Sequence, residues 1–427
     1  MSELSYLEKL LDGVEVEWKP LKDVCDFKNG FAFKSSLFKE TGLPIVRITN
    51  IDGFNVDLDE VKYFSLNDYK EDLSSFEVSM GNILIAMSGA TTGKVGIYKK
   101  GTKCYLNQRV GKFIPKENIL NNNYLYHFLL LNTETIYILA GGGAQPNLSS
   151  NALMSKLLIP IPCPDNPEKS LAIQSEIVRI LDKFTALTAE LTAELNMRKK
   201  QYNYYRDQLL SFDEEQEKPV YLEKLLDGVK VEWKTLEKVL KRTKGTKITA
   251  GQMKDLHKDN APLKIFAGGK TVAFVDFKDI PEKDINREPS IIVKSRGIIE
   301  FEYYDKPFSH KNEMWSYHSN NDAISIKYIY YFLKINEGYF QKIGGKMQMP
   351  QIATPDTDKF EVPIPCPDNP EKSLAIQSEI VRILDKFDTL TNSITEGLPR
   401  EIELRQKQYE YYRDLLFSFP KPETVSN

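Results

Sequence analysis

A long internal repeat constrains the fold of this chain more than any other feature. One pair of segments is identical over 25 residues, a second agrees at 12 of 13 positions, and a third is nearly as close. Repeated sequence indicates repeated structure, and two copies are too few for a solenoid, so we expect an internally duplicated protein. The matching pairs are 160–184 with 363–387, 7–19 with 222–234, and 201–212 with 408–419.

The segments between the repeated blocks are 140 and 128 residues long and show no obvious similarity to each other. The order is therefore constant, variable, constant, twice over. It suggests a shared frame that holds two different recognition domains. We expect an N-terminal constant segment, a first variable domain, a central constant region with a long helix, a second variable domain and a C-terminal constant region with a long helix, at 1–19, 20–159, 160–234, 235–362 and 363–427.

The first long helix follows a Pro-rich segment, IPIPCPDNP. Asn166 is a suitable N-cap and Pro167 a suitable first residue. From Ile173 to Leu195, apolar residues recur every three or four positions, as in a coiled coil. A helix over 168–212 would be about 67 Å long at about 1.5 Å per residue, too long for one globular core, so it needs a partner.

The second copy of the helix supplies that partner. Its seam is interrupted by EGLP, where Gly397 and Pro399 should kink or break it. We expect an α/β (mixed α+β) fold in which two long antiparallel coiled-coil helices separate two globular domains with pseudo-two-fold symmetry. The alternative is that both are core helices of ordinary domains. In the first copy, 188–191 and 192–195 both have the sequence TAEL, which is either a repeat unit or chance in an Ala/Leu/Glu-rich helix.

Composition excludes several classes of protein. Four cysteines do not make a disulfide framework, and no signal segment or apolar run of about 18 residues is present, so we expect a soluble protein of a reducing cytoplasm, with no membrane partner. The formal charge is −3, but it divides into +2 and +4 for the two variable segments and −9 for the remainder. Since phosphate contact drives non-specific DNA binding, this favours the variable segments as the DNA side. A solvated mixed surface explains the bias equally well.

Candidate contact residues lie in Gly-rich or strand-end segments of both variable domains. Arg pairs bidentately with guanine, and Asn or Gln with adenine, so side chains of these types next to close-approach backbone are candidates for reading DNA. Each is equally a turn residue or a solvated side chain. In the first domain they are Thr91, Thr92, Lys94, Gln108, Arg109, Gln145 and Asn147, and in the second Lys270, Lys294, Arg296, Lys346 and Gln348.

Enzyme motifs fail one by one. GATTGKV is similar to a phosphate-binding loop, but Ser88 and Val95 stand where that loop requires Gly and Ser or Thr. The four histidines lack H-E-x-x-H spacing, and the cysteines form no C-x-x-C pair for zinc. No catalytic residue and no metal site are therefore predicted.

The constant blocks resemble the specificity subunit of a type I restriction–modification enzyme, and more closely its type IC branch, including the TAEL blocks. The match covers YLEKLLDGVEVEWK, IPIPCPDNPEKSLAIQSEIVRILDKF, TALTAELTAELNMRKKQYNYYRDQLLSF and the C-terminal constant region, about 160 residues. In the first variable domain, NGFAFKSSLF, LPIVRITNI and ILIAMSGATTGKVG resemble one class of target-recognition domain, which adds Lys34 and Arg47 to the DNA-binding candidates. The second variable domain resembles a different class.

The resemblance implies a DNA-recognition subunit without catalytic activity. Each variable domain would read one half of a split site in double-stranded DNA, and the helices would set the spacer and bind two modification (methyltransferase) subunits. The chain itself would hold no cofactor: S-adenosylmethionine would lie in the modification subunits, which methylate adenine at N6, and ATP and Mg²⁺ in two restriction (motor-nuclease) subunits. The alternatives are a fused nuclease or methyltransferase, which the missing motifs disfavour, and a coiled-coil scaffold that binds proteins only.

Overall fold

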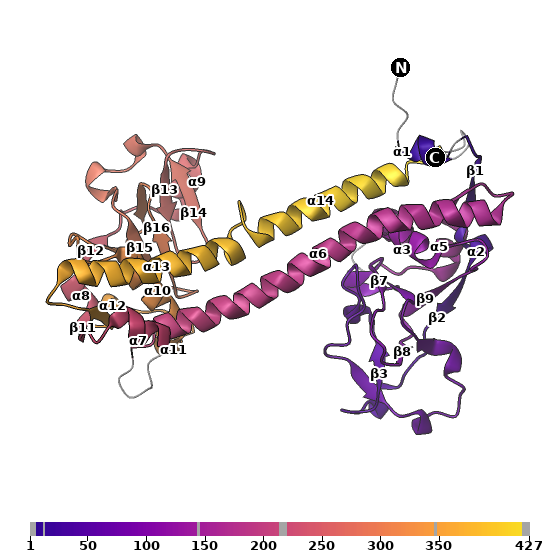
Figure 1. Cartoon of the computed structure of the whole chain (residues 1–427), viewed down its shortest axis with the longest axis horizontal. Coiled ribbons are helices and arrows are strands. Elements are labelled where there is room, and N and C mark those ends of the chain that lie inside the picture. The colour runs from indigo at the N-terminus through magenta and orange to yellow at the C-terminus, as the bar shows by residue number, and fades with distance from the viewer. Residues whose placement is uncertain (1–5, 12, 143–145, 213–219, 346–347, 421–427) are drawn as a thin grey trace, which may run out of the picture. The chain divides into compact units, whose positions relative to one another are not determined.

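The computed structural model describes residues 6–11, 13–142, 146–212, 220–345 and 348–420. The chain divides into two compact units (Figure 1). Unit 1 comprises Met1–Leu191 and Glu401–Asn427, and unit 2 comprises Thr192–Arg400. Each unit therefore contains one variable segment together with helical segments from both constant regions. No helix among the described residues is long and apolar enough to cross a membrane.

Unit 1 is built on two four-stranded sheets, with strand orders β2-β9-β6-β7 and β4-β3-β8-β5. Its central strand β6 is buried along its whole length, as its sequence ILIA requires. A separate pair, β1 and β10, joins the N-terminal constant segment to the strand that precedes the long helix. The strands are β1 Val16–Pro20, β2 Cys25–Asn29, β3 Leu43–Val46, β4 Lys62–Phe64, β5 Glu77–Val78, β6 Ile83–Ala86, β7 Val95–Ile97, β8 Cys104–Leu106, β9 Val110–Pro115 and β10 Leu158–Pro162.

The helices of unit 1 cover one side of these sheets and include short 3-10 turns in the connections. In order along the chain they are α1 Tyr6–Leu11, α2 Leu21–Val24, η1 Ser35–Leu37, η2 Ile48–Asn50, η3 Leu66–Asp68, η4 Ser74–Phe76, η5 Gly89–Thr91, α3 Asn122–Leu131, α4 Thr133–Leu139 and α5 Ser150–Lys156. Residues from α3, β6, β9 and the long helices form one continuous apolar core.

Unit 2 repeats this topology although the two variable segments show no obvious sequence similarity. Its sheets have the orders β12-β18-β15-β16 and β14-β13-β17, and β11 pairs with β19. In both units the second sheet contains one parallel pair, β3 with β8 and β13 with β17. The strands are β11 Val231–Thr235, β12 Lys241–Lys244, β13 Leu263–Phe266, β14 Val272–Val275, β15 Ser290–Lys294, β16 Glu300–Tyr304, β17 Phe308–His310, β18 Trp315–His318 and β19 Glu361–Pro365.

One buried hydrogen bond shows how closely the two units match. The hydroxyl of Tyr124 donates to the carbonyl of Pro160 at 2.9 Å, and the hydroxyl of Tyr328 donates to that of Pro363 at 2.8 Å. Both tyrosines lie on the helix that follows the first sheet and are fully buried. The remaining helices of unit 2 are α7 Val220–Leu226, α8 Leu236–Val239, α9 Ala250–Leu256, η6 Phe277–Asp279, η7 Glu282–Asp284, α10 Ile326–Ile335, α11 Glu337–Gly344 and α12 Thr354–Asp358.

The long helices confirm the sequence prediction. Helix α6 runs from Pro167 to Leu209, and the side chain of Asn166 accepts a hydrogen bond from the backbone N–H of Lys169 at 3.0 Å. It ends three residues before the predicted boundary at 212. The second copy is broken at the EGLP sequence into α13 Pro370–Asn392 and α14 Leu398–Leu416.

The two copies of the helix run antiparallel within each unit (Figure 1). In unit 1 the rings of Phe184 and Tyr412 stack with centroids 5.1 Å apart, and in unit 2 Tyr205 stacks on Phe387 at 5.6 Å. A second contact holds α14 in unit 1, where Tyr409 and His127 share a buried hydrogen bond of 2.9 Å. The predicted fold class, two sheet-rich domains on a duplicated helical frame, is confirmed.

Candidate nucleic-acid interface

In unit 1, three loops meet beyond the carboxyl end of β6. The backbone N–H of Met87 donates to the carbonyl of Arg109 at 2.9 Å, and that of Leu148 donates to the carbonyl of Met87 at 2.8 Å. Gly89 adds a third bond, to the carbonyl of Pro146 at 3.3 Å. We call the residues 87–94, 107–110 and 146–148 loop cluster 1. It brings together candidates that are up to 56 positions apart in the sequence.

The side chains of loop cluster 1 divide into structural and exposed groups. Thr92 is buried, and its hydroxyl donates to the carbonyl of Gly89 at 2.7 Å, so it shapes the loop. The hydroxyl of Thr91 is buried without a hydrogen-bond partner among the described residues. The exposed members are Lys94, Gln108, Arg109 and Asn147. These four present ammonium, guanidinium and amide groups, which suit phosphates and base edges.

Arg47 lies at the edge of the sheet that carries this cluster. It follows β3, and β3 is parallel to β8, so the carboxyl ends of the two strands share one edge. The backbone N–H of Asn107 donates to the carbonyl of Val46 at 3.0 Å, which ties that edge to the cluster. The guanidinium of Arg47 donates to the carbonyl of Glu60 at 3.3 Å, and its Nε is buried without a partner among the described residues.

Two candidates of the first domain stand apart from loop cluster 1. Lys34 is exposed after β2, and its backbone N–H donates to the hydroxyl of Tyr69 at 3.1 Å. No printed contact joins it to the loops beyond β6. Gln145 lies outside the described residues.

Unit 2 has the same loop arrangement beyond β15. The backbone N–H of Gly297 donates to the carbonyl of Pro350 at 2.9 Å, and that of Ile352 donates to the carbonyl of Ser295 at 3.0 Å. These bonds are the counterparts of those from Gly89 and Leu148 in unit 1. We call the residues 295–297, 311–314 and 348–352 loop cluster 2.

The strand registers pair individual positions of the two clusters. An isolated antiparallel bridge joins Ser88 to Asn147 in unit 1, and another joins Arg296 to Gln351 in unit 2. Ser88 thus corresponds to Arg296, and Asn147 to Gln351. The two clusters therefore share a backbone design and differ in the side chains that they present.

Arg296 is held by a side chain that the sequence reasoning missed. Its guanidinium donates from Nε and Nη2 to Oε1 of Gln351, at 3.2 and 3.0 Å. The signal was present in the sequence: Pro146-Asn147-Leu148 and Pro350-Gln351-Ile352 share the order proline, amide, aliphatic residue. Gln348 is exposed in the same loop, whereas Lys346 lies outside the described residues.

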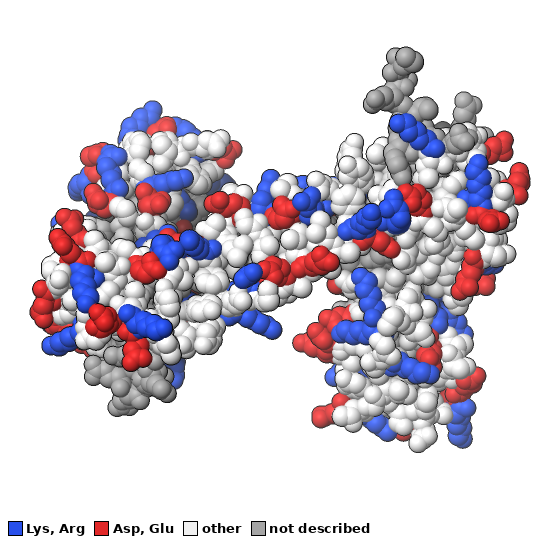
Figure 2. All heavy atoms as spheres, viewed as in Figure 1, with Lys and Arg blue, Asp and Glu red and all other residues white. Residues whose placement is uncertain are grey.

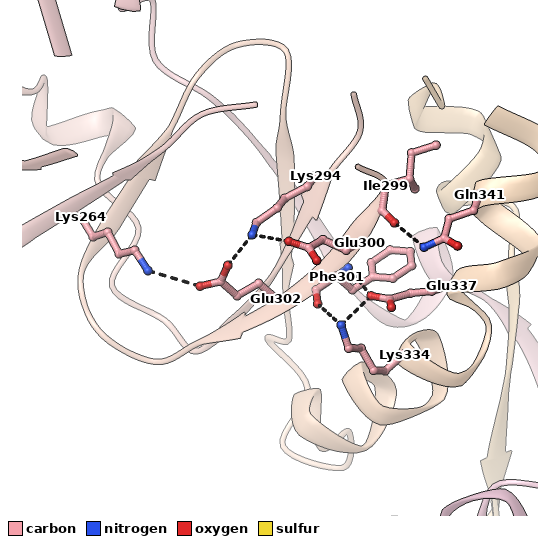
Figure 3. Close-up of polar contacts among 9 residues, drawn as sticks. All are labelled: Lys264, Lys294, Ile299, Glu300, Phe301, Glu302, Lys334, Glu337 and Gln341. Carbon is pink, nitrogen blue, oxygen red and sulfur yellow. Dashed lines mark hydrogen bonds and ion pairs between the residues drawn. The ribbon is translucent and has the colours of Figure 1, made fainter. Parts of the chain in front are cut away.

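Lys270 and Lys294 have contrasting environments. Lys270 is exposed in the turn between β13 and β14. The side chain of Lys294 is only 8% exposed, and its Nζ lies 2.6 Å from Glu300 and 2.8 Å from Glu302 (Figure 3). Glu302 also pairs with Lys264 at 3.3 Å. A buried ammonium that already faces two carboxylates is poorly placed for a phosphate, so we correct its expected role from DNA contact to support of the sheet.

The electrostatics of this ion-pair network oppose one another. Burial lowers the pKa of the Lys294 ammonium, but its hydrogen bonds to Glu300 and Glu302 outweigh burial and raise the pKa above its ordinary value. The ammonium is therefore charged in the folded protein, and the network fixes the end of β15 just before Arg296. Position 294 corresponds to Ala86 in unit 1, which lies in the same register of β6.

The surface in view carries no broad field of one sign. Lys and Arg side chains are interspersed with Asp and Glu on both units (Figure 2). Within the described residues no cluster of three or more His, Cys, Asp and Glu side chains is placed to hold a metal ion. The exposed donors of the two loop clusters therefore remain the chemical groups that stand out.

Comparison with known proteins shows the family. A family model described as "Type I restriction modification DNA specificity domain" matches residues 13–198 and 230–404. The type I restriction enzyme EcoR124I/EcoR124II specificity subunit of Escherichia coli is 40% identical over 452 residues, covering 100% of both chains.

Two solved structures share the fold. The S subunit of a type I restriction-modification system from M. genitalium matches with a TM-score of 0.61 and 17% identity, over 96% of this chain and 98% of that chain. A structure described as the basis of complex assembly and conformational transition of the type I R-M system matches with a TM-score of 0.51 and 14% identity, over 94% of this chain and 97% of that chain.

Proposed function

The chain belongs to the type I restriction–modification DNA specificity family, and on that basis we propose that it is the non-catalytic subunit that selects the DNA site for methylation and restriction. The family membership supports neither a fused nuclease or methyltransferase nor a scaffold that binds proteins only. The level of identity to the EcoR124I/EcoR124II subunit, together with the TAEL blocks, supports placement in the type IC branch.

Each variable domain, 20–159 and 235–362, reads one half of a split site in double-stranded DNA. The observation that carries this proposal is the pair of loop clusters. Their backbones are joined by equivalent hydrogen bonds, yet Ser88 and Asn147 stand where Arg296 and Gln351 stand in the other unit. One architecture with different exposed side chains is what two readers of different sequences require.

The chemistry of loop cluster 2 favours guanine. Both bonds from Arg296 end on Oε1 of Gln351, so the acceptor of the amide is occupied and its two N–H groups remain free. The pair therefore offers donors only. In the major groove guanine presents two acceptors, N7 and O6, whereas adenine presents one acceptor and one donor.

Loop cluster 1 favours adenine. The amide of Asn147 is exposed and carries both a donor and an acceptor. Asparagine pairs bidentately with adenine through N7 and the N6 amino group. We therefore expect an adenine contacted in the half-site of the first domain and a guanine in that of the second.

The constant helices provide the assembly surface. Two modification subunits bind to the frame of α6, α13 and α14, and two restriction subunits complete the complex. S-adenosylmethionine is held by the modification subunits, and ATP and Mg²⁺ by the restriction subunits. This chain holds none of these groups.

Methylome sequencing tests the proposal. A host without other adenine methylation is given this chain with its modification subunits, and all N6-methyladenine is mapped. We expect one bipartite motif with an unread spacer. Absence of methylation at any defined motif from an assembled, soluble complex would refute the proposed function.

A further inference from the structure

A groove of about 820 Å³ lies beside loop cluster 2 on the surface of unit 2. Asn312 and Met314 of the cluster line one end, and Thr354 lies just beyond its last segment. The groove is therefore continuous with the loops that we assign to base reading.

Four basic side chains line this groove. Arg242, Lys244 and Lys247 come from β12 and the turn after it, and Lys283 comes from η7. Two carboxylates, of Asp279 and Asp284, are also part of the lining, so the cations are in excess. We call the four cations and the hollow that they line the basic groove.

Most of this positive charge is uncompensated. Arg242 pairs with Asp358 at 3.1 Å. Lys244, Lys247 and Lys283 are exposed, and no ion pair is formed by any of them within the described part of the chain. Three ammonium groups next to a base-reading loop are positioned to meet the phosphates that flank the bases being read.

The corresponding strand of unit 1 lacks this charge. β2 and β12 are both edge strands and pair with β9 and β18 in the same register. The sequence at 241–247 is KRTKGTK, whereas the equivalent sequence at 26–32 is DFKNGFA. There, Phe27 packs on Phe113 with ring centroids 5.0 Å apart.

Edge protection is the competing explanation, because lysines on an edge strand prevent pairing with other sheets. It does not account for the difference between the units, since the equally exposed edge β2 carries a single lysine. Nor does it explain why Lys283, from a turn outside the sheet, faces the same hollow.

We infer that the basic groove binds the phosphodiester backbone of duplex DNA beside the half-site read by unit 2, so that the second domain supplies most of the salt-dependent affinity and the first domain mainly reads bases. This inference rests on the proposed function. It predicts that the two halves of the site contribute unequally to non-specific binding.

The test compares two triple variants in the complex with modification subunits. One is Lys244→Gln, Lys247→Gln and Lys283→Gln, which neutralises the basic groove. The matched control is Lys230→Gln, Lys306→Gln and Lys359→Gln, three exposed lysines of unit 2 outside the groove. Binding to a labelled duplex that carries the wild-type motif is measured between 50 and 200 mM salt.

Each lost phosphate contact lowers the slope of log K against log salt by about 0.9, so the groove variant should lose about 2.7. A fourfold rise in salt should then weaken it about 40-fold less than the wild-type complex. The control should retain the wild-type slope, and both variants should methylate the wild-type motif. Arginine at the three groove positions should restore the slope.

Two results would overturn the inference. They are an unchanged slope in the groove variant and an equal loss of slope in the control, and melting temperatures of all variants show whether they are folded. A wild-type complex that binds no motif would instead refute the proposed function, so the two failures are distinguishable.

Discussion

Replacement of Lys294 by methionine separates a structural role from a DNA contact. Methionine keeps most of the volume of the side chain but removes the charge, leaving Glu300 and Glu302 without their shared partner (Figure 3). If Lys294 supports the sheet, the variant loses stability and keeps the salt dependence of DNA binding. If it contacts phosphate, the variant keeps its stability and loses about 0.9 of the salt slope.

The magnitude follows from burial. Removal of one partner from a buried ion pair costs about 3–5 kcal/mol. The lysine side chain is 8% exposed, but the two glutamates are 26% and 32% exposed, so water screens part of their repulsion. We therefore expect a loss of about 2–3 kcal/mol in the free energy of unfolding, or about 5–10 °C in melting temperature for a unit of this size.

Neutralising the glutamates provides the control. The combined variant Lys294→Met, Glu300→Gln and Glu302→Gln should recover at least half of the lost stability, because no unpaired charge remains. Differential scanning calorimetry of the full chain measures both variants. A Lys294→Met variant as stable as the wild type would refute the reasoning.

The pH dependence of the same variant has a defined sign. The pKa of Lys294 is raised in the folded protein, with burial opposing and hydrogen bonds to Glu300 and Glu302 prevailing. Its contribution is therefore fully present below the unfolded pKa of about 10.4 and is lost as pH rises through the higher folded value. The stability difference between wild type and variant should be constant near neutral pH and shrink only above about pH 10.4.

Four further predictions concern recognition. A third TAEL block after Leu195 adds about 6 Å and a net rotation of about 40° to α6, close to the about 35° of one base pair, so methylome sequencing should show a spacer longer by one base pair; an unchanged spacer would show that α6 is not the ruler. Exchange of 235–362 for another recognition domain should change one half of the motif only, and a change in both halves would contradict modular reading. Arg296→Ala should cost about 1–3 kcal/mol in specific binding and relax one guanine position, while Gln351→Ala should give the same relaxation with a smaller loss; a retained motif in both would remove the pair from the interface. The purified chain alone should transfer no methyl group from S-adenosylmethionine in a radiolabel assay, and transfer that survives rigorous purification would contradict the non-catalytic assignment.

The frame of this protein was predictable because its signals are local or repeated. The Asn166 cap, the apolar spacing along α6 and the break at Gly397 depend on neighbours within a few turns of helix. The internal repeat then applied each conclusion twice. For the same reason the family could be recognised from the constant blocks before any site was known.

The candidate site was predictable only in part. Residue type and Gly-rich context located Lys94, Arg109 and Arg296 in segments that the structure shows to be exposed. The same criteria selected Lys294, whose partners Glu300 and Glu302 lie across a hairpin. A lysine next to a strand end looks alike in sequence whether it faces solvent or two carboxylates.

What the sequence by itself determined is the duplicated helical frame and the positions of two unlike inserts within it. What only the tertiary structure decided is that the inserts share one topology, that Gln351 holds Arg296 across 55 positions, and that a run of lysines at 241–247 lines a groove. The physical reason is the range of the interactions. Helix periodicity and capping act within a few residues, whereas strand register and loop contacts join segments whose separation in the chain carries no local signal.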